Sequence, residues 1–167
     1  MAETVFAVTQ SGPAHQPDPC RIWVDGEIFS RQQRAVPVSP DAQGALCYVS
    51  SGPCLPGSGV RVVSSAGEDV PLGGVGEILI RSDCLFDGYY NRPDLTAKAM
   101  RDGWYCSGDL GFYLDGELYV IGRKKDLIIV AGKNIYPQDV EEIVSSHPAV
   151  HDGRVIAFGQ FQARFEE

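Results

Sequence analysis

The stretch Gly122–Ile143, which reads GRKKDLIIVAGKNIYPQDVEEI, is where the pattern of the sequence changes. Upstream of it, short apolar runs alternate with glycine-containing turns, a pattern typical of short β-strands. Inside it, the apolar run 127–130 predicts a strand, and Pro137 with the acids behind it predicts the start of an amphipathic helix. Downstream, the apolar residues of 150–158 predict a second strand. We therefore place a domain boundary at Lys125–Asp126, between a turn-rich β unit and a strand–helix–strand unit.

The region upstream of the boundary is expected to be mostly β-structure. An apolar run at 5–8 predicts a buried strand, and the pattern from 46 to 80 predicts several more, with the firmest at 60–63 and 76–80. A proline then opens a short predicted helix at 94–100. A long helix between 46 and 80 would contradict this interpretation.

A hairpin is expected near the start of this region, because Asp25–Gly26 lies between the apolar runs 21–24 and 27–29. Short strands separated by glycine turns favour a small barrel or sandwich. We therefore expect an α+β fold: a β-rich, barrel-like subdomain followed by a small, incomplete α/β C-terminal domain.

Composition excludes several classes of protein. Of 167 residues, 44% are apolar and 22% charged, which is typical of a globular chain. The net charge of −8 argues against a nucleic-acid partner, since binding to a phosphate backbone needs clustered cations. No apolar run is long enough to cross a bilayer, and the first residues are not those of a signal peptide. Five cysteines without a Cys-x-x-Cys spacing indicate free thiols, so we expect a cytoplasmic protein.

The one dense basic run, Arg123–Lys125, is conspicuous on an acidic chain. An arginine and two lysines can hold phosphate or ribose oxygens, and Gly132 would let the backbone approach a ligand closely. Residue types alone leave a second interpretation open, namely a solvated basic turn between two strands.

Order and spacing favour the first interpretation, because the stretch resembles the hinge motif of the acyl-adenylating superfamily. That superfamily comprises acyl-CoA synthetases, fatty-acyl-AMP ligases, luciferases and adenylation domains. The positions that match the motif are Gly122, Arg123, Lys125, Gly132, Pro137 and Glu141. Upstream, 105–109 is similar to the family's Tyr-x-Thr/Ser-Gly-Asp, and 74–81 with 88–90 resembles the segment before it. Residues 1–4 resemble the end of Tyr-Gly-x-Thr/Ser-Glu, with Ala2 in place of a hydroxyl residue, as in the fatty-acyl-AMP ligase and long-chain branch.

The resemblance implies nucleotide-binding roles for three side chains. Asp109 would accept hydrogen bonds from the ribose hydroxyls of ATP, a task that suits an ionised carboxylate. Arg123 would contact ribose or phosphate through its fixed fork of donors. Glu3 would bind magnesium, since a carboxylate oxygen suits a hard cation. The alternatives are an acid in a turn for Asp109 and a frayed terminal acid for Glu3.

The resemblance also implies a moving part. Lys125 falls at the position about which the family's small C-terminal domain rotates between adenylate and thioester formation. Gly132 and Lys133 would then lie near the pantetheine of CoA or of a carrier protein. For Gly132 a simple turn after a strand remains the alternative.

Together these assignments predict an ordered set of parts. Residues 1–122 would form the C-terminal part of the large AMP-binding domain, 123–126 the hinge, and 127–167 the start of the small domain. The family's Ser/Thr/Gly-rich phosphate loop and its distal catalytic lysine are not present, so we expect a fragment that is inactive alone.

The implied enzyme is a ligase that activates a carboxylic acid, fatty on this resemblance, with ATP and Mg²⁺ to acyl-AMP. The acyl group would then pass to CoA or a phosphopantetheine carrier. The alternative function is a non-catalytic nucleotide- or protein-binding module descended from such an enzyme.

Overall fold

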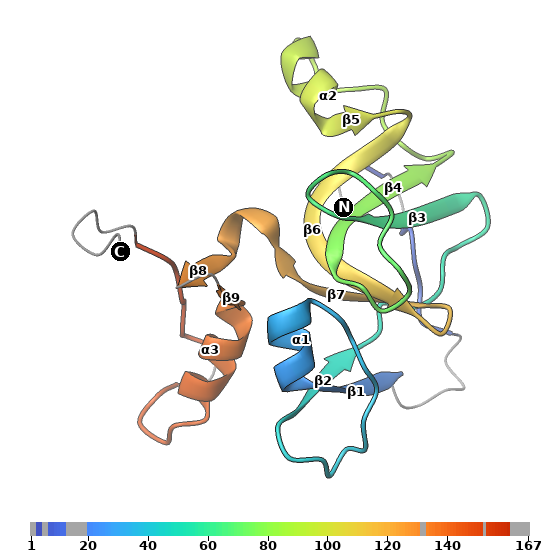
Figure 1. Cartoon of the computed structure of the whole chain (residues 1–167). Coiled ribbons are helices and arrows are strands. Elements are labelled where there is room, and N and C mark those ends of the chain that lie inside the picture. Colours follow the sequence, from blue (N-terminus) through green and yellow to red (C-terminus); the bar gives the residue numbers. More distant parts are fainter. Residues whose placement is uncertain (1–2, 5–6, 13–19, 131–132, 152, 161–167) are drawn as a thin grey trace. The chain divides into compact units, whose positions relative to one another are not determined.

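The computed structural model describes residues 3–4, 7–12, 20–130, 133–151 and 153–160. The chain divides into two compact units, residues 1–121 and 122–167 (Figure 1).

A two-stranded sheet opens the first unit. Strand β1 (Arg21–Asp25) pairs antiparallel with β2 (Ala45–Val49), and helix α1 (Gly26–Gln32) follows β1 directly. The hairpin expected at Asp25–Gly26 is therefore wrong. The Asp25 carboxylate instead accepts a hydrogen bond from the backbone N–H of Ile28 at 2.9 Å and caps the helix.

A five-stranded sheet forms the rest of this unit: β3 (Ser58–Val63), β4 (Gly76–Ser82), β5 (Met100–Arg101), β6 (Trp104–Leu114) and β7 (Glu117–Arg123). The order is β3-β4-β6-β5, and β7 also pairs with β6. The strands expected at 60–63 and 76–80 are confirmed, and no helix lies between 46 and 80. The expected barrel-like closure is not seen, because β3 pairs with β4 alone among the described strands and leaves an open edge.

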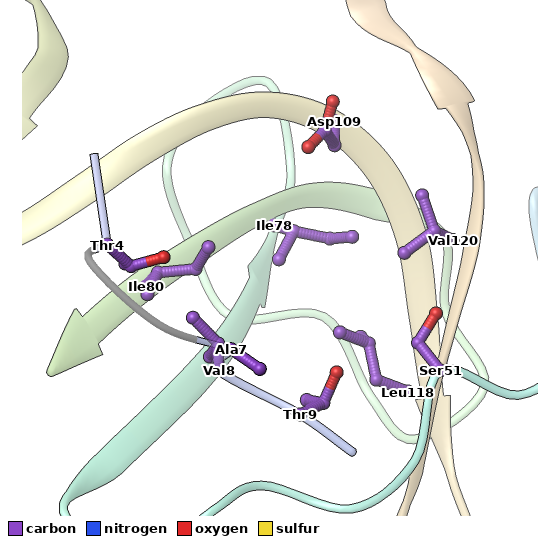
Figure 2. Close-up of a pocket in the computed structure, with 10 residues that line it drawn as sticks. All are labelled: Thr4, Ala7, Val8, Thr9, Ser51, Ile78, Ile80, Asp109, Leu118 and Val120. Carbon is purple, nitrogen blue, oxygen red and sulfur yellow. The ribbon is translucent and has the colours of Figure 1, made fainter. Parts of the chain in front are cut away.

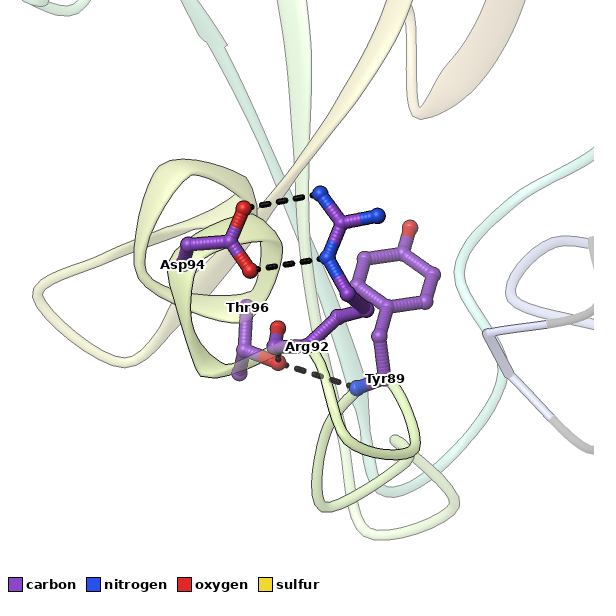
Figure 3. A network of polar contacts seen from close by, with 4 residues as sticks. All are labelled: Tyr89, Arg92, Asp94 and Thr96. Atoms are coloured by element: carbon purple, nitrogen blue, oxygen red, sulfur yellow. Dashed lines mark hydrogen bonds and ion pairs between the residues drawn. The ribbon is translucent and has the colours of Figure 1, made fainter.

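Helix α2 (Pro93–Ala99) confirms the short helix that begins at a proline. Arg92 holds the carboxylate of Asp94 through two hydrogen bonds of 2.9 and 2.8 Å (Figure 3). The Thr96 hydroxyl accepts from the backbone N–H of Tyr89 at 2.9 Å and donates to the Arg92 carbonyl at 3.1 Å. These contacts fix the loop that carries Tyr89 against the helix.

The core of the first unit has two neighbouring parts. One packs side chains of β4, β6 and β7 against the segment near residue 8; its buried members are Val8, Ile78, Ile80, Tyr105 and Leu118. The other is aromatic and brings together Phe29, Tyr48, Phe112 and Tyr119, with ring centroids 4.8 to 5.9 Å apart. Both parts of the core include side chains of β6 and β7 and so hold these two strands in place.

The second unit contains a short 3₁₀ turn, η1 (Lys124–Asp126), the antiparallel pair β8 (Ile128–Val130) and β9 (Lys133–Ile135), and helix α3 (Pro137–Ser145). The strand expected at 127–130 and the helix opened by Pro137 are confirmed. No helix in the described part of the chain is long and apolar enough to cross a membrane.

The strand expected at 150–158 is not formed in the described residues of that range. A strand needs a neighbour for its backbone groups, and here the N–H of Ala157 donates instead to the Glu141 carboxylate of α3 at 2.9 Å. The side chains of Ile156 and Phe158 remain 83% and 76% exposed. Apolar composition alone was therefore a misleading signal there.

Candidate functional site

The register between β4 and β6 is broken at one place. Glu77 lies opposite Leu110, but Leu79 lies opposite Cys106, so β6 contributes more residues to this interval than β4 does. The excess makes a β-bulge, a feature that re-aims side chains and is common beside functional sites. The bulged segment is Ser107-Gly108-Asp109, and Gly108 adopts a φ of +71° that an L side chain rarely takes.

The side chain of Ser107 spans the bulge. It is 9% exposed, and its hydroxyl donates to the Ile78 carbonyl of β4 at 2.7 Å. The same oxygen accepts from the backbone N–H of Asp109 at 3.0 Å. One hydroxyl therefore ties the displaced part of β6 to the facing strand.

Asp109 borders a cavity of about 250 Å³ in the first unit. In the view of Figure 2, Asp109 lies at one end and Thr9 at the other, with Ile78 and Leu118 between them. The complete lining is Thr4, Ala7, Val8, Thr9, Ser51, Ile78, Ile80, Asp109, Leu118 and Val120. One carboxylate and three hydroxyls on apolar walls are the composition expected of a site for a small, partly polar ligand.

One wall of this cavity depends on Gly52, which has a φ of +94°. A Cβ there would come within 2.0 Å of the backbone of Gln10. This close approach lets the N–H of Gln10 donate to the Pro53 carbonyl at 3.2 Å and the N–H of Leu55 donate to the Val8 carbonyl at 2.9 Å. The segment that supplies Val8 to the lining is held in this way.

Glu3 lies beside the cavity rather than in it, although its neighbour Thr4 is part of the lining. The Tyr89 hydroxyl donates to the Glu3 carboxylate at 3.0 Å, and the Phe86 N–H donates to the Glu3 carbonyl at 2.9 Å. Burial by itself raises the pKa of Glu3, but hydrogen bonds from its own N–H, Tyr89 and Tyr105 outweigh it, so the pKa lies below the ordinary value. Glu3 is therefore an ionised carboxylate held in place, not a frayed terminal acid.

The described residues contain no group of three or more histidine, cysteine or acidic side chains that could enclose a metal ion. Glu3 would contribute a single protein ligand. Magnesium is commonly held by one or two carboxylates together with phosphates and water, so one ionised carboxylate is compatible with it.

The remaining predicted site residues belong to the second unit. Arg123 and Lys125 are exposed, the first at the end of β7 and the second in η1. Lys125 borders a cavity of about 390 Å³, whose lining also includes Gln138 and Glu141 of α3. Lys133 is the exposed first residue of β9, and Gly132 lies outside the described residues.

No role was predicted from the sequence for three residues that lie in or beside the cavity: Ser107, Thr9 and Ser51. Ser107 was visible only as part of a motif, whereas its two hydrogen bonds depend on the register of β4 and β6. The lining residues Thr9 and Ser51 carry no sequence signal, because they come from separate segments that meet only in the fold.

Known proteins resemble this chain closely. It is 41% identical over 108 residues to a long-chain-fatty-acid–CoA ligase of Yersinia pestis, covering 64% of this chain and 19% of the relative. It is 44% identical over 110 residues to a 2-succinylbenzoate–CoA ligase of Bacillus mycoides, covering 62% and 23%. A solved fatty acyl-adenylate ligase, from work on the E. coli and L. pneumophila enzymes, matches 95% of this chain and 28% of its own, at 38% identity and a TM-score of 0.85.

The chain belongs to the AMP-forming acyl-adenylating superfamily. This confirms the resemblance inferred from the ordered motifs of the sequence. An ATP-bound chimera of known structure, 36% identical with a TM-score of 0.56 over 59% of this chain, is similar to the same region. The family thus uses ATP, and its CoA ligases use CoA.

The match to this superfamily covers only part of each relative. No protein-family model matches the chain. The chain spans only 19% to 28% of the length of the acyl-adenylating relatives named here. Those relatives are named for different acids, one aliphatic and one aromatic.

Proposed function

We propose that this chain supplies the ribose-binding and hinge segment of an ATP-dependent acid ligase. The observation that carries the proposal is Asp109, placed by a β-bulge at the edge of a cavity whose other polar groups are hydroxyls. An ionised carboxylate only accepts hydrogen bonds and can accept from two neighbouring hydroxyls at once. A ribose, which presents two adjacent hydroxyls, is the part of ATP that fits this end of the cavity.

Glu3 would hold the magnesium ion that accompanies ATP. A carboxyl of ordinary pKa is already ionised at neutral pH, and the Glu3 pKa is lowered further; its hard oxygen ligands suit Mg²⁺. When bound, the ion would neutralise phosphate charge. The task of the chain's own residues is to keep the carboxylate in place, and the hydroxyl of Tyr89 does this at 3.0 Å.

The second unit would form the start of the small mobile domain. We assign residues 1–122 to the large domain, 123–126 to the hinge and 127–167 to the small domain. Arg123 and Lys125 are exposed in this segment and so accessible to a nucleotide or to the rest of an enzyme. Gly132 and Lys133 would approach pantetheine in the thioester-forming state.

A fatty acid is the substrate class we favour. The support is the TM-score of 0.85 to a fatty acyl-adenylate ligase and the identity to a long-chain-fatty-acid–CoA ligase. The acid would react with ATP to acyl-AMP and pyrophosphate, and a thiol of CoA or of a carrier protein would then displace AMP. The 167 residues hold no Ser/Thr/Gly-rich phosphate loop, so we expect no pyrophosphate exchange from this chain by itself.

Nucleotide binding tests the proposal directly. ATP titrated into the 167-residue chain should bind, and Asp109→Ala should weaken that binding about tenfold or more, because hydrogen bonds to a charged group contribute about 1.5–3 kcal/mol each. Asp41→Ala is the matched control, since Asp41 is exposed and does not line the cavity. Equal affinity in both variants, or no ATP binding by the unaltered chain, would favour a protein-binding module instead.

The hinge assignment needs an enzyme that contains all of the family's motifs. In such a protein, Lys125→Pro should spare ATP–pyrophosphate exchange more than thiol-dependent product release, because proline fixes φ and favours one of two conformers. If both half-reactions fell equally with the fold intact, a direct binding role for the basic run would be the better account.

A further inference from the structure

We propose that Ser107 is the positioning residue that aims Asp109 at the ribose, and that its hydroxyl rather than its size performs this task. The inference rests on the nucleotide-binding function proposed above. It assigns a role to a buried side chain that does not itself line the cavity.

The need for a positioning group follows from the bulge. Where β4 and β6 are in register, the ladder of backbone hydrogen bonds holds each residue of β6 in place. Between Glu77 and Leu79 that register is interrupted, and Asp109 lies in the interrupted part. Gly108 beside it has a positive φ, and the position that a Cβ would take there has no heavy atom within 4 Å, so no side-chain packing at that position holds the bulge.

The Ser107 hydroxyl supplies the restraint that the ladder lacks. It donates its proton to the Ile78 carbonyl of β4 at 2.7 Å, and Ile78 stands between the two residues where register is lost. Its oxygen then accepts from the N–H of Asp109 at 3.0 Å. Each end of this bridge is a backbone group, so the bridge fixes the main chain from which the Asp109 carboxylate projects.

Ile78 links the Ser107 hydrogen bonds to the cavity, because its carbonyl accepts from Ser107 and its side chain lines the cavity. Its side chain is 2% exposed and lines the same cavity as Leu118 and Asp109. The same residue therefore supplies an apolar wall and the anchor for the bulge. A shift of the bulge would move the carboxylate relative to that wall.

The test compares nucleotides that differ in the group Asp109 would hold. Affinities of the 167-residue chain are measured for ATP and for dideoxy-ATP, which lacks both ribose hydroxyls, in the unaltered chain and in Ser107→Ala. We expect the unaltered chain to prefer ATP about tenfold or more, and Ser107→Ala to reduce this preference below about threefold while binding dideoxy-ATP as before. Ser107→Thr, which keeps the hydroxyl, should restore the preference.

A merely structural role predicts a different pattern. If Ser107→Ala weakened both nucleotides by the same factor, or kept the full preference for ATP, the positioning role would be overturned. Ser107→Cys is the second variant in case the alanine protein does not fold, because a thiol of similar size is only a weak donor. It should give an intermediate preference.

Hydrogen exchange separates failure of this inference from failure of the proposed function. If the unaltered chain shows no preference for ATP, the ribose role of Asp109 fails. The two hydrogen bonds of Ser107 are then tested through the backbone amide of Asp109. In Ser107→Ala this amide should exchange with solvent about tenfold faster or more, while the amide of Phe112 on the same strand should exchange at an unchanged rate. Equal exchange at Asp109 in the two proteins would refute the bridge itself.

Discussion

Replacing Gly52 by alanine should destabilise the first unit through two separable effects. The first is backbone strain, since a non-glycine residue at a φ of +94° costs about 1–2 kcal/mol. The second is a collision, because the new Cβ would lie 2.0 Å from the backbone of Gln10 and must displace it. That displacement breaks the hydrogen bonds from Gln10 to Pro53 and from Leu55 to Val8, each contributing about 0.5–1.5 kcal/mol.

The expected total is a loss of about 2–5 kcal/mol, which is a large part of the stability of a small domain. Gly116→Ala isolates the first effect. Gly116 has a φ of +83° in the turn between β6 and β7, and no atom lies within 4 Å of the position that a Cβ would take there. This control should lose only about 1–2 kcal/mol.

Urea unfolding followed by tryptophan fluorescence measures both variants. Trp23 and Trp104 are the two tryptophans of the chain, and both belong to the first unit, so the signal reports that unit. If the free energies of unfolding of Gly52→Ala and Gly116→Ala agreed within about 0.5 kcal/mol, the close approach of the Gln10 segment would be refuted.

Two further predictions concern a helix cap and a pH dependence. Asp25→Ala should cost about 1 kcal/mol of unfolding free energy in the same assay, because it removes the acceptor for the Ile28 N–H; an unchanged urea midpoint would contradict the cap. Tyr89→Phe should cost less than about 1 kcal/mol near neutral pH, since Glu3 is partly exposed and water screens the contact. The Glu3 pKa is lowered, so this stabilisation exists above the ordinary value of 4.5 and is lost as pH falls through the folded-state pKa; a difference between Tyr89→Phe and the unaltered chain that persisted in acid would contradict it.

The sequence by itself determined strands β3, β4 and β8, the starts of helices α2 and α3, and the family. Apolar runs between glycine turns predicted β3 and β4, because a strand buried in a sheet must place apolar side chains in the core. Prolines marked the starts of α2 and α3, since a first-turn position needs no backbone donor. Motif order along the chain was enough to predict the superfamily before any contact was known.

Long-range pairing decided the rest. An Asp-Gly pair serves equally as a hairpin turn or as a helix start, and pairing of β1 with β2, more than a dozen residues further along, selected the helix. Residues 155–158 are apolar, but strand formation also needs a neighbouring strand, and the N–H of Ala157 instead donates to the Glu141 carboxylate. The bulge that carries Asp109 arises from the register of β6 against β4, and a register is a relation between two segments that neither segment encodes alone.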